Sequence, residues 1–129
     1  MIVDSSAVVA ILLREPGHEK LLTHLSTAPG AGIGTPTLAE TGIVLAARLG
    51  VPGRSLLARF IEEAGLIAVP FGDHHWRAAV DAYTRFGKGR HPAALNFGDC
   101  MTYATARLAG EPLLCLGGDF ARTDLALVA

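Results

Sequence analysis

Residues 95–109 read LNFGDCMTYATARLA, and their pattern predicts a helix that anchors the fold and carries an acid in its first turn. Asn96 is a good N-cap, and Asp99 lies three residues later, where its carboxylate can reach back to the free amides of that turn. Apolar side chains then recur at spacings of three and four, namely Cys100, Met101, Tyr103, Ala104 and Leu108. We therefore expect this helix to pack on a core and to open its N-terminus toward a pocket.

Composition excludes several classes of protein. The chain has 129 residues, 50% of them hydrophobic, which predicts one folded domain over residues 1–129. No apolar run approaches the ~20 residues of a membrane span, and the N-terminal MIVDSS lacks the features of a signal peptide, so we expect a cytoplasmic protein without a membrane partner. The net charge of −1 argues against a generic polyanion binder and limits nucleic-acid contacts to a local patch.

The cysteines and the paired histidines do not have the spacing of metal ligands. Cys100 lies in the predicted helix and Cys115 in a predicted strand, so we expect both to be reduced packing residues. His74 and His75 are adjacent rather than four residues apart, so they cannot share one helix face to bind zinc. We expect them in the first turn of a helix.

Short apolar segments alternate with helical patterns along the whole chain. The expected strands are residues 1–4, 31–35, 66–69, 112–116 and 125–128. The expected helices, besides that of 95–109, are residues 5–14, 18–25, 36–49, 53–64 and 73–86. In the last of these we expect Asp73 to be the cap and the inward face to be formed by Trp76, Ala79, Val80 and Tyr83. The alternation predicts an α/β protein with a mainly parallel sheet and helices on both faces.

Acidic residues follow the strands of this predicted sheet. Asp4 ends the first strand, Asp119 follows strand 112–116, and Glu40 lies about one turn into the helix after strand 31–35. Because ligands bind beyond the carboxyl ends of parallel strands, we expect these acids to converge there with Asp99. Neighbouring carboxylates repel one another unless a cation lies between them, and all-oxygen ligands favour Mg²⁺ or Mn²⁺. The chemistry indicated is metal-dependent hydrolysis of a phosphodiester.

Each of these acids also has a purely structural interpretation. Asp4 can cap the helix that follows it, and Asp99 can simply complement its helix dipole, a contribution of about 0.5–1 kcal/mol. Glu40 shares a helix stripe with Ile43, Val44 and Ala47, and that stripe is either inward or exposed.

Several segments together resemble the PIN-domain ribonucleases and, more narrowly, the VapC toxins of bacterial VapBC toxin–antitoxin modules. They are MIVDSSAVVAIL at 1–12, the helix that contains Glu40, GKGRHPAALNFGDC at 87–100 and GGDFARTDL at 117–125. The resemblance implies that Asp4, Glu40, Asp99 and Asp119 are the catalytic acids and hold Mg²⁺ or Mn²⁺, with Ser6 in support. It further implies a three-layer α/β/α sandwich.

The resemblance also implies activity and partners. They are endoribonuclease activity on RNA such as tRNA or rRNA, a homodimer, and inhibition by a VapB antitoxin that packs on the toxin helices. The apolar helices 36–49 and 53–64 are the expected groove for that partner. The best candidates for RNA phosphate contacts are Lys88, Arg90 and His91, although their loop is equally explained as a solvated connector. Arg122 is a further candidate, unless it pairs with Asp124.

Two other functions compete with this interpretation. A phosphatase that uses Asp4 as its nucleophile would need a second Asp two residues later, where this chain has Ser6. A module that binds RNA and metal but has lost turnover is supported by Gly118, because the family often has an acid at that position, directly before the acid matched by Asp119.

Overall fold

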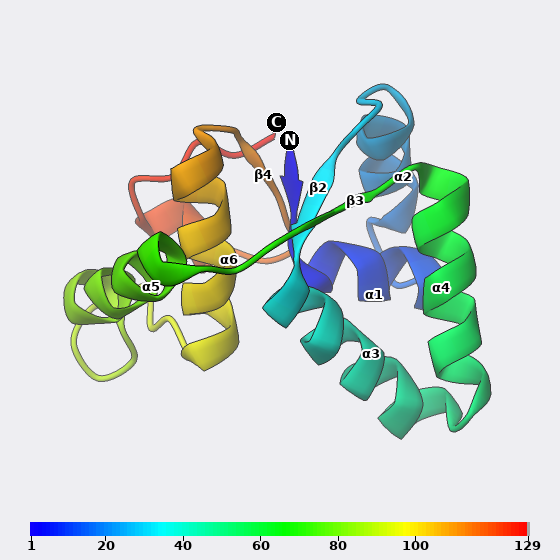
Figure 1. Ribbon diagram of the computed structural model, residues 1–129, viewed down its shortest axis with the longest axis horizontal. Helices are drawn as coiled ribbons and strands as arrows, with labels where there is room; N and C mark the ends of the chain where they lie inside the picture. The colour runs from blue at the N-terminus through cyan, green and yellow to red at the C-terminus, as the bar shows by residue number, and fades with distance from the viewer. Residues whose placement is uncertain (129) are drawn as a thin grey trace.

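The computed structural model describes residues 1–128 and arranges short parallel strands between two layers of helices (Figure 1). The elements are, in chain order, β1 Ile2–Val3, α1 Ser5–Leu13, α2 His18–Ser26, β2 Gly32–Gly34, α3 Thr35–Leu49, α4 Pro52–Ala64, β3 Ile67–Val69, α5 Asp73–Phe86, α6 Phe97–Ala109, β4 Leu113–Leu114 and the 3-10 helix η1 Phe120–Arg122. The sheet has the order β3-β2-β1-β4, and all its pairings are parallel. The predicted α/β/α sandwich is therefore confirmed.

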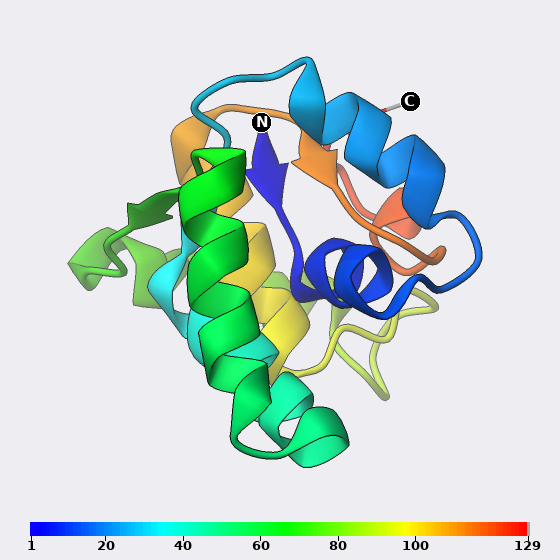
Figure 2. The same cartoon turned by 90° about the vertical axis from the view of Figure 1, so that its right-hand side faces the viewer.

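Successive side chains of the central strands enter two different cores. Ile2 and its neighbour Leu113 pack with α5 and α6, whereas Val3 and its neighbour Leu114 pack with α1, α2 and α4. This is the alternation expected when a sheet is covered on both faces. Figure 1 shows α5 and α6 on one side of the strands, and Figure 2 shows α4 to the left of α1 and α2 on the other.

Helix caps fix where the two functionally interesting helices begin. The Asp4 carboxylate accepts a hydrogen bond from the Ser6 amide and caps α1, as predicted. At the start of α6, the Asn96 side chain accepts from the Asp99 amide and the Asp99 carboxylate accepts from the Asn96 amide, at 2.9 and 3.0 Å. This reciprocal pair is a capping box, so the predicted cap of α6 is confirmed.

The start of α5 differs from the prediction. Its N-cap is Gly72, whose amide donates to His75 Nδ1, and Asp73 is the first helical residue. The Asp73 carboxylate accepts from Trp76 Nε1 instead and lies near the Arg77 guanidinium. His74 and His75 lie in the first turn, as expected.

The inward face of α5 was also predicted wrongly for its large residues. Trp76, Val80 and Tyr83 are 48%, 58% and 44% exposed. The residues of α5 that are buried are Ala79, Ala82 and Phe86. Small alanine side chains let α5 approach α6 closely, and the bulky apolar residues are left on its flank.

The C-terminal segment does not form the predicted strand. Leu127 makes only an isolated parallel bridge to Leu113, because β4 is two residues long and offers a single position for pairing.

The free cysteines are Cys100, which is buried, and Cys115, which is partly buried just after β4. In the described part of the chain, no helix has both the length and the apolarity needed to cross a membrane.

Candidate functional site

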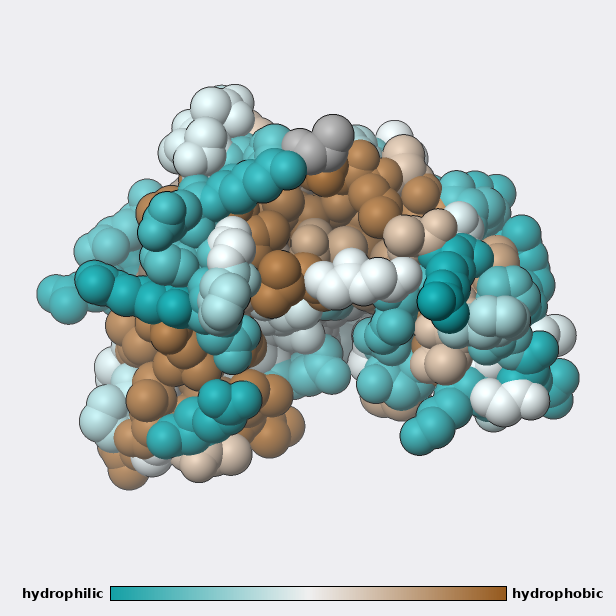
Figure 3. All heavy atoms as spheres, turned by 180° about the vertical axis from the view of Figure 1, so that it is seen from behind, coloured by the Kyte–Doolittle hydropathy of each residue, from teal (hydrophilic) through white to brown (hydrophobic). Residues whose placement is uncertain are grey.

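The four predicted acids are brought to the same edge of the sheet. Asp4 follows β1, Asp119 comes shortly after β4, Glu40 lies in α3, which follows β2, and Asp99 lies in the first turn of α6. The charges of the other three acids all act on the Asp99 carboxyl group. A hollow of about 390 Å³ lies between α3 and the start of α6, with Glu40 at its border. Seen from behind in Figure 3, the molecule is notched at its lower centre, between the part with α3 and the part with α6.

Asp4 is buried and both of its oxygens are bound. It is 4% exposed. Oδ2 accepts from the Ser6 hydroxyl at 2.6 Å and from the Ser6 amide at 3.1 Å, and Oδ1 accepts from the Thr102 hydroxyl at 2.7 Å. Thr102 in turn lies 3.0 Å from the hydroxyl oxygen of Thr37. A buried carboxylate with this many hydrogen-bond donors is fixed in place.

Glu40 is half-buried against the first turn of α6. Its Oε1 accepts from the Ser5 hydroxyl at 2.9 Å, so the adjacent residues Ser5 and Ser6 hold two different acids. Its other oxygen lies against Gly98, where a Cβ atom would overlap Oε2 and stand 2.8 Å from Cδ. The stripe that Glu40 shares with Ile43 is otherwise exposed, since Ile43 is 70% exposed.

Asp99 is unusually easy to protonate for an aspartate. Its pKa is raised from 3.8 to about 6, first because burial penalises the charged form and then because of the charges of Asp4, Asp119 and Glu40. The hydrogen bond from the Asn96 amide acts in the opposite direction. This bond engages Oδ2, whereas Oδ1 accepts no hydrogen bond from the protein within residues 1–128.

Asp119 differs from the other acids because it is exposed. Within residues 1–128, its carboxylate accepts no hydrogen bond and forms no ion pair, and only its carbonyl oxygen accepts a bond, from the Arg122 amide. Gly117, with φ of 98°, and Gly118 directly precede it. Two glycines before an unattached carboxylate give Asp119 more freedom to move than the other acids have.

The donors fit a hard divalent cation, although the acids do not form a closed coordination shell. Within residues 1–128, no three Asp, Glu, His or Cys side chains lie close enough to hold a metal ion. Mg²⁺ keeps several of its waters and needs only one or two protein carboxylates together with substrate phosphate. The free oxygen of Asp99 and the unattached carboxylate of Asp119 meet that requirement.

Some of the predicted RNA-contacting side chains are exposed, and others are bound within the protein. Lys88 and Arg90 are exposed in the loop before α6. The His91 ring accepts from the Ala93 amide at 3.0 Å and lies edge-on to Phe86.

Arg122 has a structural role and does not pair with Asp124. It donates to the Pro92 carbonyl at 3.1 Å. The partners of Asp124 are instead Tyr103, Arg85 and Arg107.

Three polar residues at the site were missed in the sequence: Ser5, Thr37 and Thr102. All are hydroxyl residues beside a predicted acid or on the face of a helix that packs inward. Thr37 and Thr102 are 2% and 1% exposed. A hydroxyl on a buried face needs a hydrogen-bond partner, so Thr102 on the apolar face of α6 was the available signal. Its partner Asp4 is 98 residues away, and the sequence does not specify that contact.

Comparison with known proteins relates the chain to one family. Residues 1–125 match the model of the PIN domain. The chain is 50% identical to Ribonuclease VapC36 of Mycobacterium tuberculosis over 126 residues, which are 97% of this chain and 91% of that protein. Among solved structures, it is similar to M. tuberculosis VapC20, a toxin that cleaves the sarcin-ricin loop, with a TM-score of 0.79 and 20% identity over 98% of this chain and 97% of that one. It is also similar to VapBC2 of Rickettsia felis bound to a promoter DNA fragment, with a TM-score of 0.78 and 16% identity over 98% and 96% of the chains.

Proposed function

The chain belongs to the PIN-domain family and, within it, to the VapC ribonucleases. We propose that it is a toxin that hydrolyses RNA phosphodiester bonds with Mg²⁺ or Mn²⁺, which binds at the edge of the sheet where its four acids lie. The observation that carries this proposal is the placement of all four acids at one edge of the sheet, beside the hollow that Glu40 borders. The charges of Asp4, Glu40 and Asp119 add to the effect of burial in raising the pKa of Asp99. Carboxylates that repel one another at a cleft are stabilised together when a cation binds between them. With RNA as its substrate, the enzyme acts in the cytoplasm.

The acids have different parts in this reaction. Asp99 and Asp119 offer free oxygens and would hold the cation, whereas the oxygens of Asp4 are already bound by Ser6 and Thr102. Glu40, held by Ser5, borders the hollow from the side of α3. A bound divalent cation would activate a water nucleophile and stabilise the charge that develops on the phosphate.

The fixed position of Asp4 also argues against the phosphatase alternative. A nucleophilic aspartate needs an oxygen free to attack phosphorus, and both oxygens of Asp4 accept hydrogen bonds inside the protein. For RNA binding, the exposed cations Lys88 and Arg90 are the proposed phosphate contacts, while His91 and Arg122 shape the loop.

Asp99→Asn tests the proposed function directly. We expect the variant to fold, because an Asn side chain keeps the size of Asp and an oxygen for the capping bond, and to lose cleavage of a pool of tRNA and rRNA in Mg²⁺ or Mn²⁺. Loss of one metal-binding carboxylate removes the stabilisation of charge at the phosphate. Cleavage is measured by mapping fragment ends, beside a sample in EDTA.

Asp73→Asn is the matched control, since Asp73 is an exposed acid in the first turn of α5. It is expected to cleave at the parent rate. Cleavage by Asp99→Asn at the parent rate would remove Asp99 from the mechanism. Folded parent protein that binds Mn²⁺ and RNA but cuts nothing would support the module without turnover, and changing Gly118 to Asp would be the next step.

A second copy of the chain is the proposed partner of the apolar face formed by α3, α5 and α6. A hollow of about 500 Å³ there is lined by Phe71, Trp76, Ala79, Val80, Tyr83, Phe97, Cys100 and Met101, none of them charged. It shares Phe97 and Met101 with the hollow beside Glu40. Depletion of charge together with aromatic residues and Met is typical of the centre of a dimer interface.

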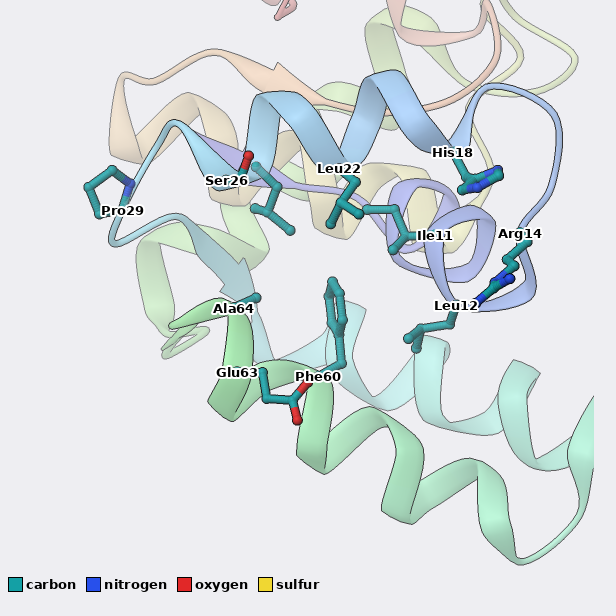
Figure 4. Close-up of a pocket in the computed structure, with 11 residues that line it drawn as sticks. Ile11, Leu12, Arg14, His18, Leu22, Ser26, Pro29, Phe60, Glu63 and Ala64 are labelled. Carbon is teal, nitrogen blue, oxygen red and sulfur yellow. The ribbon is translucent and has the colours of Figure 1, made fainter.

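A VapB antitoxin is the proposed partner of the groove between α1, α2 and α4 (Figure 4). This hollow of about 790 Å³ has an apolar floor, where Phe60 points from α4 toward Leu22 of α2, and charged groups such as Arg14 and Glu63 on its rim. Such a groove suits an amphipathic helix. Helix 53–64 thus contributes to the proposed groove as expected, whereas helix 36–49 lies on the proposed dimer face.

A further inference from the structure

Helix α6 carries one of the four acids and contacts two others. It carries Asp99, binds Asp4 through Thr102, and lies against Glu40 at Gly98. The remaining acid, Asp119, makes no direct side-chain contact of this kind in the described chain. The question is therefore what holds the segment on which Asp119 lies.

Tyr103 connects α6 to that segment. It is 1% exposed and its hydroxyl donates to Asp124 Oδ1 at 2.6 Å. Arg85 donates to the other oxygen of Asp124 at 3.2 Å, and Arg107 lies 3.5 Å from that oxygen. Burial alone would raise the pKa of Asp124, but the bond from Tyr103 and the two cations outweigh it and keep the pKa low.

The segment between Asp119 and Asp124 is short and internally bonded. It consists of η1 and Thr123, whose hydroxyl donates to the Phe120 carbonyl at 2.7 Å. Phe120 itself is 4% exposed within the core beside α5 and α6. A displacement of Asp124 is therefore passed on to Asp119. Gly117 and Gly118, on the other side of Asp119, do little to fix its position.

We propose that Tyr103, through its hydrogen bond to Asp124, is the positioning residue that holds Asp119 where it can bind the metal ion. Tyr103 lies one helical turn after Asp99, so a single helix sets the distance between the two acids with free oxygens. This inference rests on the proposed role of Asp119 as a metal ligand.

The test is Tyr103→Phe, which removes the hydroxyl and keeps the buried ring. We expect its affinity for Mn²⁺, measured by isothermal titration calorimetry without RNA, to fall about tenfold, as is typical when a residue that orients a metal ligand is lost. Thr105→Val is the matched control, because Thr105 is a buried hydroxyl on the same helix that donates only to the Met101 carbonyl. It is expected to bind Mn²⁺ like the parent.

A double-mutant cycle separates positioning from general loosening of the fold. If Tyr103 acts through Asp119, adding Tyr103→Phe to Asp119→Asn causes no further loss of Mn²⁺ affinity. An equal loss in both backgrounds would overturn the proposal, and so would parent-like affinity in Tyr103→Phe. Should Tyr103→Phe not fold, Asp124→Ala, which removes the acceptor of the Tyr103 hydroxyl, takes its place in the cycle with the same expected pattern.

Different results would contradict the metal site and the positioning role of Tyr103. Parent protein that binds no Mn²⁺ would overturn both the metal site and the role of Tyr103. Binding that is lost in Asp99→Asn but unchanged in Tyr103→Phe would retain the metal site and overturn only the role of Tyr103.

Discussion

The sequence left two roles open for Asp99, capping a helix and binding a metal ion, and its two carboxylate oxygens allow both. Oδ2 accepts from the Asn96 amide and completes the cap of α6, while Oδ1 accepts no hydrogen bond within residues 1–128. Capping thus orients the carboxylate and does not compete with metal binding. Asp4 differs, because it caps α1 through Oδ2 and accepts from Thr102 through Oδ1.

The raised pKa of Asp99 predicts how stability changes with pH. Because the folded protein holds this proton with a pKa of about 6, against 3.8 for an ordinary aspartate, the folded state binds more protons between those values. The contribution of Asp99 to stability therefore decreases as pH rises through this range. In EDTA, we expect the Tm of the parent minus that of Asp99→Asn to be greater at about pH 5 than at about pH 7.

Mn²⁺ provides the control for this measurement. It binds the ionised carboxylate, so it is expected to raise the Tm of the parent more at about pH 7 than at about pH 5 and to have little effect on Asp99→Asn. A Tm difference that does not change with pH in EDTA would mean that Asp99 titrates as an ordinary aspartate, and the repulsion among the acids would then be too weak to require a cation.

Residues that act through local geometry could be predicted, and those that act across the fold could not. The caps by Asp4 and Asn96 depend on neighbours within three residues, and both were predicted. The bond from Thr102 to Asp4 and the contact between Glu40 and Gly98 join residues far apart in the chain. Their partners become known only once the helices are packed.

At the scale of elements, the order of strands and helices was predictable because apolar segments and helical patterns alternate clearly. The orientation of α5 was not, since its large apolar residues outnumber the alanines that pack inward. The exposed apolar residues of α5 belong to a surface that continues over α6 to α3.

Gly98 shows how one element limits another. Replacing a helical Gly by Ala usually stabilises a helix by up to about 1 kcal/mol, but a methyl group at Gly98 would occupy the position of the Glu40 carboxylate. The flexible end of Glu40 can move away, so we expect Gly98→Ala to fold with a Tm near that of the parent and to cleave RNA at least about tenfold more slowly. Thermal unfolding and cleavage rates measure the two effects.

Gly42→Ala is the control for this substitution. Gly42 lies on α3 near Glu40, and a methyl group there would meet Leu57 at an ordinary contact distance of 3.5 Å. The variant is expected to be at least as stable as the parent and fully active. Full activity in Gly98→Ala would mean that Glu40 does not need its position against α6.

At the scale of the whole molecule, two apolar surfaces lie on different sets of helices and are proposed to bind different partners. The surface on α3, α5 and α6 reaches Glu40, so a second copy bound there would border the cleft. The groove on α1, α2 and α4 belongs to the opposite layer of the sandwich.

Reciprocal variants separate the two surfaces. Val80→Glu places a charge on the first surface, where Val80 is 58% exposed, and is expected to give a monomer by light scattering that a VapB antitoxin still binds. Leu22→Glu, at a residue 46% exposed in the groove, is expected to remain dimeric and to escape that antitoxin. Val51→Glu, at a residue 90% exposed outside both, is the control. Loss of both properties in either variant would contradict two separate surfaces.

The long separation of Asp4 from its partners has a consequence for synthesis on the ribosome. Thr102 follows Asp4 by 98 residues, and the Leu116 amide that bonds to Ser6 follows it by 110. At about 5–20 residues per second, roughly 5–20 s pass between the addition of Asp4 and that of Thr102, 98 residues later. Until then the nascent chain contains Asp4 and Glu40 with the serines that bind them, but it lacks helix α6, which binds Asp4 and contacts Glu40. The proposed site, which needs Asp99 and Asp119, therefore cannot form before translation of the chain is nearly complete.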